Sequence, residues 1–383
     1  MSWAEFIFWV SAFLIFHTYI GYPLVLVALS VFFAKQRTYD ENHLPTVSMI
    51  FAAYNEDSII KDKLENCQTL DYPAEKLEIL IGSDGCTDRT NEIAHNYVND
   101  RIRLKAFTQR RGKAAVLNDL AGAARGEILV FSDANSMYKS DAIRRLVGFF
   151  ADKEVGGVCG RLVLLSHGGK LEADGERLYW DYENYLKYLE GRIKTVIGAN
   201  GAIYAIRREL FRALPTQEII TDDFVIALRV VQAGQDVIYE KDAVAWEYTS
   251  PNVRAEFKRK KRIGAANYFS IRHVFSLLNP SKGFVAFGLW SHKVIRWIAP
   301  FLLLAIFTAN LFLLNQTHYR FIFLMQTIFY SIALVAWIFD RLGKPIRWLV
   351  YPYYFVMANL ALLVGFFKFV MNSEKPAWTR VER

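Results

Sequence analysis

The sequence predicts an α/β domain, built on a sheet with helices on both faces and flanked by helices that span a membrane. Between residues 46 and 134, short apolar runs alternate with segments of helical periodicity, which is typical of parallel strands joined by helices. Polar side chains follow these runs directly, where such sheets bind ligands. Four windows have the length and apolar character of a bilayer-spanning helix, about 20 residues: 6–34, 297–314, 321–339 and 348–367.

The first apolar window is expected to be an uncleaved membrane anchor. Residues 6–34 contain no Asp, Glu, Lys or Arg. The stretch is far longer than the apolar core of a signal peptide, about 7–15 residues, and no A-x-A cleavage pattern follows it. Lys35 and Arg37 come directly after it. The positive-inside rule therefore places this end of the anchor in the cytoplasm.

The central part of the chain is expected to be one large cytoplasmic domain. Its three cysteines are odd in number and lack metal-ligand spacing, as is typical of reduced thiols. We predict an anchor at 1–34, the cytoplasmic domain at 35–275, an interfacial linker at 276–296, three membrane helices at 297–371 and a polar tail at 372–383. The tail is basic, and the positive-inside rule disfavours a basic segment on the outer side of the membrane. Whether the last apolar window crosses fully is therefore left open.

The net charge of +8 is small and partly local, because the segment 253–273 holds seven Lys or Arg against one Glu. Beside a membrane anchor, such a segment favours anionic lipid head groups, a pyrophosphate or a lipid-linked acceptor over nucleic acid as partners.

The first half of the central domain contains four expected strands and three expected helices. The apolar runs predict strands at 46–55, 77–85, 101–107 and 127–134. Helical patterns lie at 57–70, from about Asp88, and at 111–124.

Polar residues at the strand ends indicate a ligand site at one edge of the sheet. Asn55 and Glu56, Asp84, and Asp133 follow three of the strands. Taken singly, Asp84 with Gly85 fits a turn and Asp88 fits a helix cap. Taken together at one edge, these residues favour a nucleotide site. Neither G-x-G-x-x-G nor G-x-x-x-x-G-K-[ST] is present, which speaks against a dinucleotide fold and a P-loop.

The segment "RRGKAAVLN" places basic residues at a helix start. Arg110, Arg111 and Lys113 would face a phosphate through their charge and the helix dipole. A solvated basic helix end fits the same spacing, and both interpretations stay open.

After residue 155 the pattern changes to a strand at 157–165, a long amphipathic helix at 170–194 and a helix at 221–234. Gly198 and Gly201 would let the backbone approach a ligand closely, or simply form a turn. Asp222 and Asp223 lie in the first turn of the last helix, where acidic residues are also ordinary capping groups.

Taken in order, four motifs resemble family 2 glycosyltransferases of the GT-A fold, the family of cellulose, chitin and hyaluronan synthases. The resemblance covers roughly residues 45–265. "AAYNED" is similar to the opening strand, "SDGCTDRT" to D-G-S-T-D, "SDAN" to D-x-D and "TDD" to T-E-D. It implies a Rossmann-like mixed sheet with helices on both faces.

The resemblance also implies roles for individual residues. Asp84 would hold the base of a nucleotide sugar, beside further nucleotide contacts from Ala53, Tyr54, Asn55, Glu56, Lys113 and Asp133. Asp133 and Asn135 would bind a divalent cation, Mg²⁺ or Mn²⁺, that bridges the diphosphate. Asp223 would be the general base, with Asp222 in the place of the family's Glu. Gly201, Arg259 and Arg262 would contact the acceptor or the diphosphate.

Two departures from the family pattern bear on the reaction. Asn135 stands in place of the second D-x-D aspartate and offers only a neutral amide oxygen. Q-x-x-R-W appears as "RKKRI", with Ile263 where processive synthases have the Trp that contacts the polymer.

The resemblance therefore implies a multi-pass membrane enzyme that moves one sugar, with inversion, from a nucleotide-diphosphate sugar to a lipid-linked or oligosaccharide acceptor. Members of this family usually use a uridine diphosphate sugar as the donor. Three alternatives stay open: a processive, polymer-exporting synthase, a non-catalytic nucleotide-binding scaffold, and a transporter. The apolar windows lack Asp, Glu, Lys and Arg at their centres, which speaks against the transporter.

Overall fold

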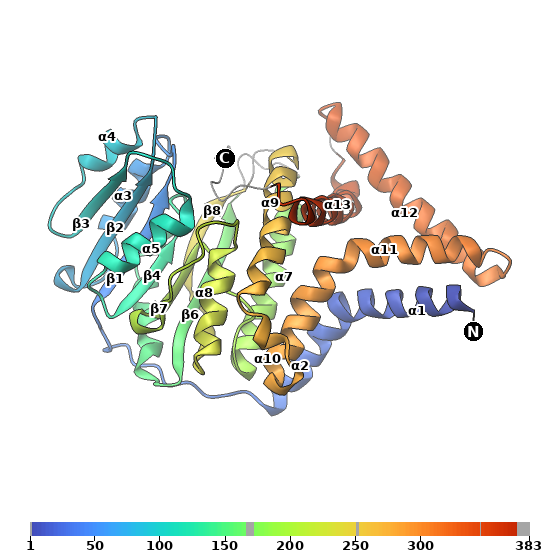
Figure 1. Cartoon of the computed structure of the whole chain (residues 1–383), viewed down its shortest axis with the longest axis horizontal. Coiled ribbons are helices and arrows are strands. Elements are labelled where there is room, and N and C mark those ends of the chain that lie inside the picture. Colours follow the sequence, from blue (N-terminus) through green and yellow to red (C-terminus); the bar gives the residue numbers. More distant parts are fainter. Residues whose placement is uncertain (1, 166–171, 250–252, 345, 374–383) are drawn as a thin grey trace.

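A computed structural model describes residues 2–165, 172–249, 253–344 and 346–373. Within them the central domain is a mixed eight-stranded sheet of order β3-β2-β1-β4-β7-β6-β8-β5. Figure 1 shows helices on both faces of this sheet. The strands are β1 Val47–Ala53, β2 Leu77–Asp84, β3 Ile102–Phe107, β4 Ile128–Ser132, β5 Met137–Tyr138, β6 Val155–Leu165, β7 Ile203–Arg207 and β8 Asp236–Tyr248.

The parallel part of the sheet matches the predicted strands. β1 pairs in parallel with β2 and with β4, and β2 pairs in parallel with β3. The second half of the domain adds antiparallel pairs, because β7 runs against both β4 and β6. The carboxyl ends of β1, β2 and β4 therefore meet at one edge, as predicted.

Alternate side chains of each central strand feed two apolar cores. Met49 and Phe51 pack on one face of the sheet with α3 and α6, while Ile50 packs on the other with α5 and α8. The domain helices are α3 Ile60–Gln68, α4 Thr90–His95, α5 Lys113–Ala123, α6 Ala142–Val147, α7 Glu172–Ile193, α8 Asp222–Gln232 and α9 Val253–Arg272. This layering is the GT-A-like α/β fold that the sequence predicts.

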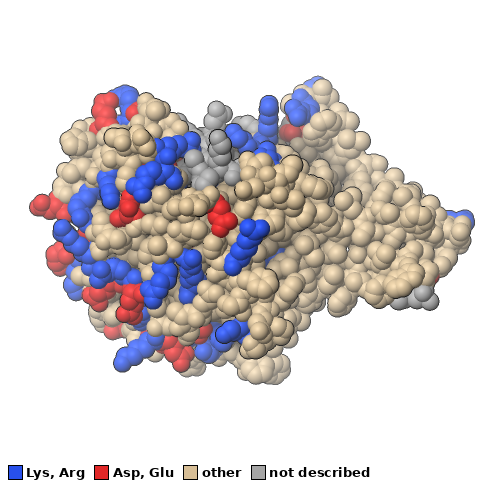
Figure 2. Space-filling view, viewed as in Figure 1, with Lys and Arg blue, Asp and Glu red and all other residues tan. Residues whose placement is uncertain are grey.

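Four helices of the described chain are long and apolar enough to cross a membrane, at Trp3–Phe32, Phe284–Phe312, Thr317–Arg341 and Val350–Val370. The first comprises α1 Trp3–Phe16 and α2 Tyr22–Phe32, joined by a π-helical turn. The second comprises α10 Phe284–Gly288, a π-helical turn and α11 Ile295–Phe312; the others are α12 Thr317–Arg341 and α13 Val350–Val370. In Figure 1, α1 and α11 run side by side away from the sheet. Lysines, arginines and acids gather over the sheet domain and are sparse over these helices (Figure 2).

The second span differs from the predicted window, because its helix starts at Phe284 rather than near 297. Its first half contains His292, Lys293 and Arg296, which lower the local hydropathy. The interfacial role of residues 276–296 stays a prediction.

Candidate active site

The turn after β1 is fixed to the loop after β2. Ala53 is the buried last residue of β1, and Asn55 has a left-handed backbone with φ 53°. The Asn55 side chain accepts a hydrogen bond from the Thr87 N–H at 2.9 Å, and the Glu56 N–H donates to Thr90 Oγ1 at 2.8 Å. These hydrogen bonds hold the predicted nucleotide-binding residues 53–56 against residues 86–90.

Asp84 holds the loop that precedes α5. Its fully buried carboxylate accepts hydrogen bonds from the N–H groups of Arg111 at 2.6 Å and Gly112 at 2.9 Å. Gly112 has φ 90°, which favours glycine. The contact of Asp84 with a base stays a prediction, whereas its hold on the Lys113 loop is a feature of the structure.

The three basic residues before α5 point in different directions. The Arg110 guanidinium lies 3.8 Å from the centre of the Tyr54 ring, over its face. Arg111 pairs with Asp119 on the surface at 2.6 Å. Lys113 is the member of this trio that reaches the acidic residues of the predicted site.

Lys113 joins two of the predicted motifs. Its ammonium lies 2.7 Å from Asp133 Oδ1, directly after β4, and 3.1 Å from Asp222 Oδ2, in the first turn of α8. Burial lowers the pKa of Lys113, but Asp133 and Asp222 raise it by more, so the lysine stays charged. Lys113 thus brings the "SDAN" and "TDD" motifs together.

Asp223 is a carboxylate of this group whose acidity is altered by its surroundings. Burial and the neighbouring Asp222 raise the pKa of Asp223 to about 6, against the opposing effect of Lys113. A Cβ on Gly201 would lie 3.4 Å from Asp133 Oδ2 and 3.6 Å from Asp223 Oδ2. The Gly201 backbone therefore lies beside both carboxylates, and the missing side chain leaves room there for a ligand.

The described residues include no group of three or more His, Cys, Asp or Glu side chains placed to hold a metal ion. Asp133 offers one carboxylate, and Asn135, two residues on, has a buried amide nitrogen without a hydrogen-bond partner in the described chain. One carboxylate with substrate phosphate oxygens is a common way to bind Mg²⁺. The residues fit a cation that arrives with a diphosphate, and the predicted metal site stays a prediction.

The two predicted arginines of α9 have contacts of a different kind. Arg259 pairs with Glu256 at 2.8 Å and with Glu176 of α7, so its charge is neutralised between two helices. Arg262 lies half-buried one turn further along α9. Their contact with acceptor or diphosphate stays a prediction.

Sequence reasoning missed two buried residues close enough to the carboxylates to interact with them electrostatically. Lys187 of α7 is nearly buried and lowers the pKa of Asp223. The buried Tyr204 ring stacks on Phe131 with centroids 4.7 Å apart, and its hydroxyl has no hydrogen-bond partner in the described chain. Neither residue belongs to a motif. The long amphipathic helix around Lys187 is the one signal for it that the sequence contains.

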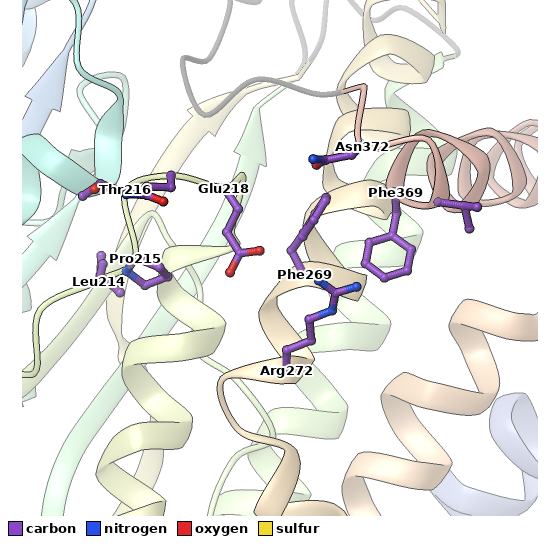
Figure 3. A pocket seen from close by; sticks show the side chains of 10 residues that line it. Leu214, Pro215, Thr216, Glu218, Phe269, Arg272, Phe369 and Asn372 are labelled. Carbon is purple, nitrogen blue, oxygen red and sulfur yellow. The ribbon is translucent and has the colours of Figure 1, made fainter.

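A large cavity lies near this group but is not lined by its residues. It has a volume of about 790 Å³ and lies between residues 214–218, the end of α9 and the end of α13. In Figure 3, the side chains of Glu218 and Arg272 extend toward the same opening, with Phe369 on its far side. The Thr221 N–H donates to Ser270 Oγ at 2.8 Å, which fixes the start of α8 to the α9 wall of this cavity.

The chain is similar in sequence and fold to known glycosyltransferases. Residues 48–214 match the family described as Glycosyl transferase family 2. The chain is 25% identical over 250 residues to the probable glycosyltransferase YdaM of Bacillus subtilis, covering 60% of this chain and 56% of that protein. It is 27% identical over 216 residues to the beta-monoglucosyldiacylglycerol synthase of Nostoc sp., covering 53% and 45%.

A solved structure extends the fold comparison to the four long apolar helices. The mannosyltransferase PcManGT of Pyrobaculum calidifontis, in complex with GDP-Man and Mn²⁺, superposes with a TM-score of 0.71 at 22% identity. The match covers 96% of this chain and 100% of that one.

The chain spans about half the length of the first curated relatives it matches, 56% and 45%. The family match contains the loop of Asp84, Lys113, Asp133 and the Gly201 backbone, and the fold match continues through α8 and the apolar helices. Residues 48–214 thus resemble family 2 glycosyltransferases in sequence, and the chain has a GT-A-like fold that carries four long apolar helices.

Proposed function

We propose that this chain is a membrane-anchored, inverting glycosyltransferase that transfers one sugar from a nucleoside diphosphate sugar to a lipid-linked acceptor. Its catalytic domain would face the cytoplasm. The observation that carries the proposal is the meeting of Asp133, Asp223 and Lys113 beside the Gly201 backbone, at the carboxyl edge of the sheet.

Asp223 is proposed as the general base for the acceptor hydroxyl. Its pKa of about 6 leaves it ionised near neutral pH yet basic enough to take a proton. The Asp223 carboxylate is oriented at the start of α8, because its Oδ1 accepts a hydrogen bond from the Phe224 N–H at 2.9 Å. Deprotonation here would let the acceptor oxygen attack the anomeric carbon from the face opposite the leaving diphosphate.

Lys113 is proposed to contact the diphosphate of the donor. It stands at the first residue of α5, where helix N–H groups and a positive charge both favour phosphate. Asp84 holds the preceding two N–H groups and so sets the position of Lys113. On donor binding, the lysine would exchange part of its contact with Asp133 and Asp222 for phosphate oxygens.

A divalent cation, Mg²⁺ or Mn²⁺, held by Asp133 with Asn135, would neutralise charge on the departing diphosphate. Asp222 would keep Lys113 in place and raise the pKa of Asp223.

The lipid acceptor and the single transfer are supported by different observations. The Nostoc relative is named as a synthase of a glucosyl lipid, and this chain carries four apolar helices beside its site. A staphylococcal relative, 22% identical over 271 residues, is named as a poly-beta-1,6-N-acetyl-D-glucosamine synthase. Ile263 replaces the polymer-contacting Trp that the family resemblance predicts for processive enzymes, which favours one sugar per acceptor.

The test is nucleotide release by the purified full chain in detergent, with a panel of sugar nucleotides, Mg²⁺ or Mn²⁺, and a lipid extract as acceptor. Asp223→Asn should lower the rate by about 10²–10⁴, the usual contribution of a positioned base. The exposed Asp100→Asn serves as the matched control and should behave as wild type. Folded protein that is silent with every donor would contradict the proposal, and products longer than one sugar would contradict single transfer.

A further inference from the structure

A second charged cluster lies buried between the sheet domain and the apolar helices. Glu183, Lys187 and Glu190 occupy one face of α7, and they meet three residues of the Phe284–Phe312 helix. Glu183 is within 3.3 Å of both His292 and Lys293, and Glu190 is 2.6 Å from His292. Arg296 also pairs with Glu183, and Lys187 lies 3.7 Å from it. None of the six side chains is more than 15% exposed.

The cluster carries more positive than negative groups. Lys187, Lys293 and Arg296 face two carboxylates, with His292 in addition. Arg296 has two buried nitrogens, Nε and Nη2, without a hydrogen-bond partner among the described residues. A buried guanidinium without full hydrogen bonding is costly, and a bound anion would complete its hydrogen bonds. The cluster therefore has one more basic side chain than carboxylates, and two nitrogens of Arg296 lack an acceptor among the described residues.

An apolar groove begins one helical turn further along α11 than Arg296 of this cluster. Its volume is about 210 Å³, and α11, α12 and α13 supply its lining. Pro300, one helical turn after Arg296, lines it, and so does Phe355, whose ring lies 5.9 Å from that of Tyr19. The Arg296 guanidinium in turn lies 5.6 Å from the Tyr19 ring and 5.5 Å from the Tyr182 ring. Tyr19 thus lies against both Arg296 and Phe355, a residue that lines the groove.

A cation next to an apolar groove matches a ligand with an anionic head and a hydrocarbon chain. Arg296 provides forked N–H donors, which suit phosphate oxygens, and Lys293 adds a second charge. The groove wall offers Leu303, Leu304, Phe307, Leu360 and Leu363 to a chain. Membrane phospholipids and polyprenyl phosphates both have this chemistry, whereas a free anion would leave the groove without a role.

We propose that Arg296 and the groove between α11 and α13 form a binding site for a membrane lipid with a phosphate monoester head. The phosphate lies on Arg296 and Lys293, and the chain lies along α11. The site is distinct from the carboxylates at the sheet edge, and lipid binding there requires no transferase chemistry. Lys187 links the two places, because it contacts Glu183 and also acts on Asp223.

Native mass spectrometry of the full chain in a neutral detergent tests this site. The probes are phosphatidic acid and a polyprenyl phosphate, compared with phosphatidylcholine and diacylglycerol of the same chain length, and with inorganic phosphate. We expect the two phosphate monoesters to bind at least tenfold more tightly than the other lipids. Equal binding of phosphatidylcholine would overturn the proposal as a general lipid shell, and equal binding of inorganic phosphate would overturn it as a free-anion site.

Two variants separate the head and chain contacts. Arg296→Gln leaves two cations and two carboxylates, a balanced cluster, and should reduce binding of phosphatidic acid at least tenfold. Leu303→Trp fills the groove and should have the same effect, while Leu324→Trp, on the exposed face of α12, should not. Wild-type binding by Leu303→Trp would overturn the proposal even if Arg296→Gln failed to fold. Donor hydrolysis should persist in Leu303→Trp, so that loss of the lipid site and failure of the proposed transferase are distinguishable.

Discussion

Two charged regions of this molecule have opposite imbalances. At the sheet edge, Asp133, Asp222 and Asp223 gather around Lys113, so negative groups are in excess. At the boundary with the apolar helices, Glu183 and Glu190 face Lys187, Lys293 and Arg296, so positive groups are in excess. The basic region is buried and the acidic region is partly buried, and an uncompensated charge is costly where water is excluded.

This difference in charge indicates which kind of ligand each region can accept. The acidic region has room beside Gly201 and suits a divalent cation with a diphosphate. The basic region has unsatisfied guanidinium nitrogens beside an apolar groove and suits a lipid phosphate. Lys187 lies between the regions and acts on both. Changing single charges on either side should therefore show how far the two regions are coupled.

Removing the shared lysine should have the largest effect on the acidic region. Lys113→Met takes this partner from Asp133 and Asp222 and removes the proposed diphosphate contact. Truncating one member of a fully buried charge pair costs about 2–5 kcal/mol. Lys113 and Asp133 are partly exposed, so we expect the lower end of this range, a fall of roughly 30-fold in kcat/KM for the donor. Steady-state kinetics measure this, with Arg111→Met as control because Arg111 pairs with Asp119 on the surface. A Lys113→Met enzyme within threefold of the control would remove Lys113 from donor binding.

Filling the space beside the carboxylates should have a smaller effect. Gly201→Ala places a methyl group 3.4 Å from Asp133 Oδ2, which the fold accommodates but a bound sugar would meet. We expect a roughly tenfold loss in kcat/KM, since small displacements at a reacting centre are costly. Thermal unfolding should be unchanged. Gly122→Ala, with nothing within 4 Å, is the control. A fully active Gly201→Ala enzyme would place the sugar elsewhere.

The sequence predicts the acidic region better than the basic one, for a physical reason. Strand ends and short motifs are local signals, so the amino-acid pattern alone identifies Asp84, Asp133, Asp222 and Asp223 as candidates. Parallel pairing of β1, β2 and β4 then brings the strand ends to one edge. The antiparallel β7 is harder to predict, because pairing of 128–132 with 203–207 joins segments far apart in the chain.

The basic region depends on contacts that no local window shows. His292, Lys293 and Arg296 make residues before 297 look too polar for a membrane helix, because their partners on α7 lie about a hundred residues earlier. Arg259 likewise matches a binding motif, while its partner Glu176 lies 83 residues away. Compensation of charge over long sequence distances is what the amino-acid pattern alone leaves open.

Restoring the second aspartate of the D-x-D pattern should increase the charge difference between the two regions, because it adds a carboxylate to the acidic region. Asn135→Asp adds a carboxylate two residues from Asp133, as in the D-x-D pattern of the family. We expect the Mn²⁺ concentration for half-maximal donor hydrolysis to fall roughly tenfold, equivalent to about 1.4 kcal/mol. The exposed Asn42→Asp is the control for added surface charge. If both variants need the same Mn²⁺ concentration as wild type, Asn135 does not lie at the metal.

The smallest effects should appear in the pH profile, where Asp223 reports on both regions. Its pKa of about 6 exceeds the ordinary 3.8, and a general base works only when ionised. The rate should therefore be low below pH 6, rise through it and level off above, because protonation at low pH removes the base. Two neighbours shift this value in opposite directions: Asp222 raises it and Lys187 lowers it.

Removing each neighbour should move the acidic limb of the profile in a known direction. Asp222→Asn removes a negative neighbour, so the pKa of Asp223 should fall and the limb should shift to lower pH. Lys187→Met removes a positive neighbour, so the limb should shift to higher pH, in each case by about half a unit to one unit. Profiles of kcat/KM, each scaled to its own plateau, separate these shifts from changes in overall rate. If the two limbs shift in these expected directions, Lys187 couples the basic region to Asp223. If the acidic limb of Lys187→Met stays at the wild-type pH, the two regions act independently.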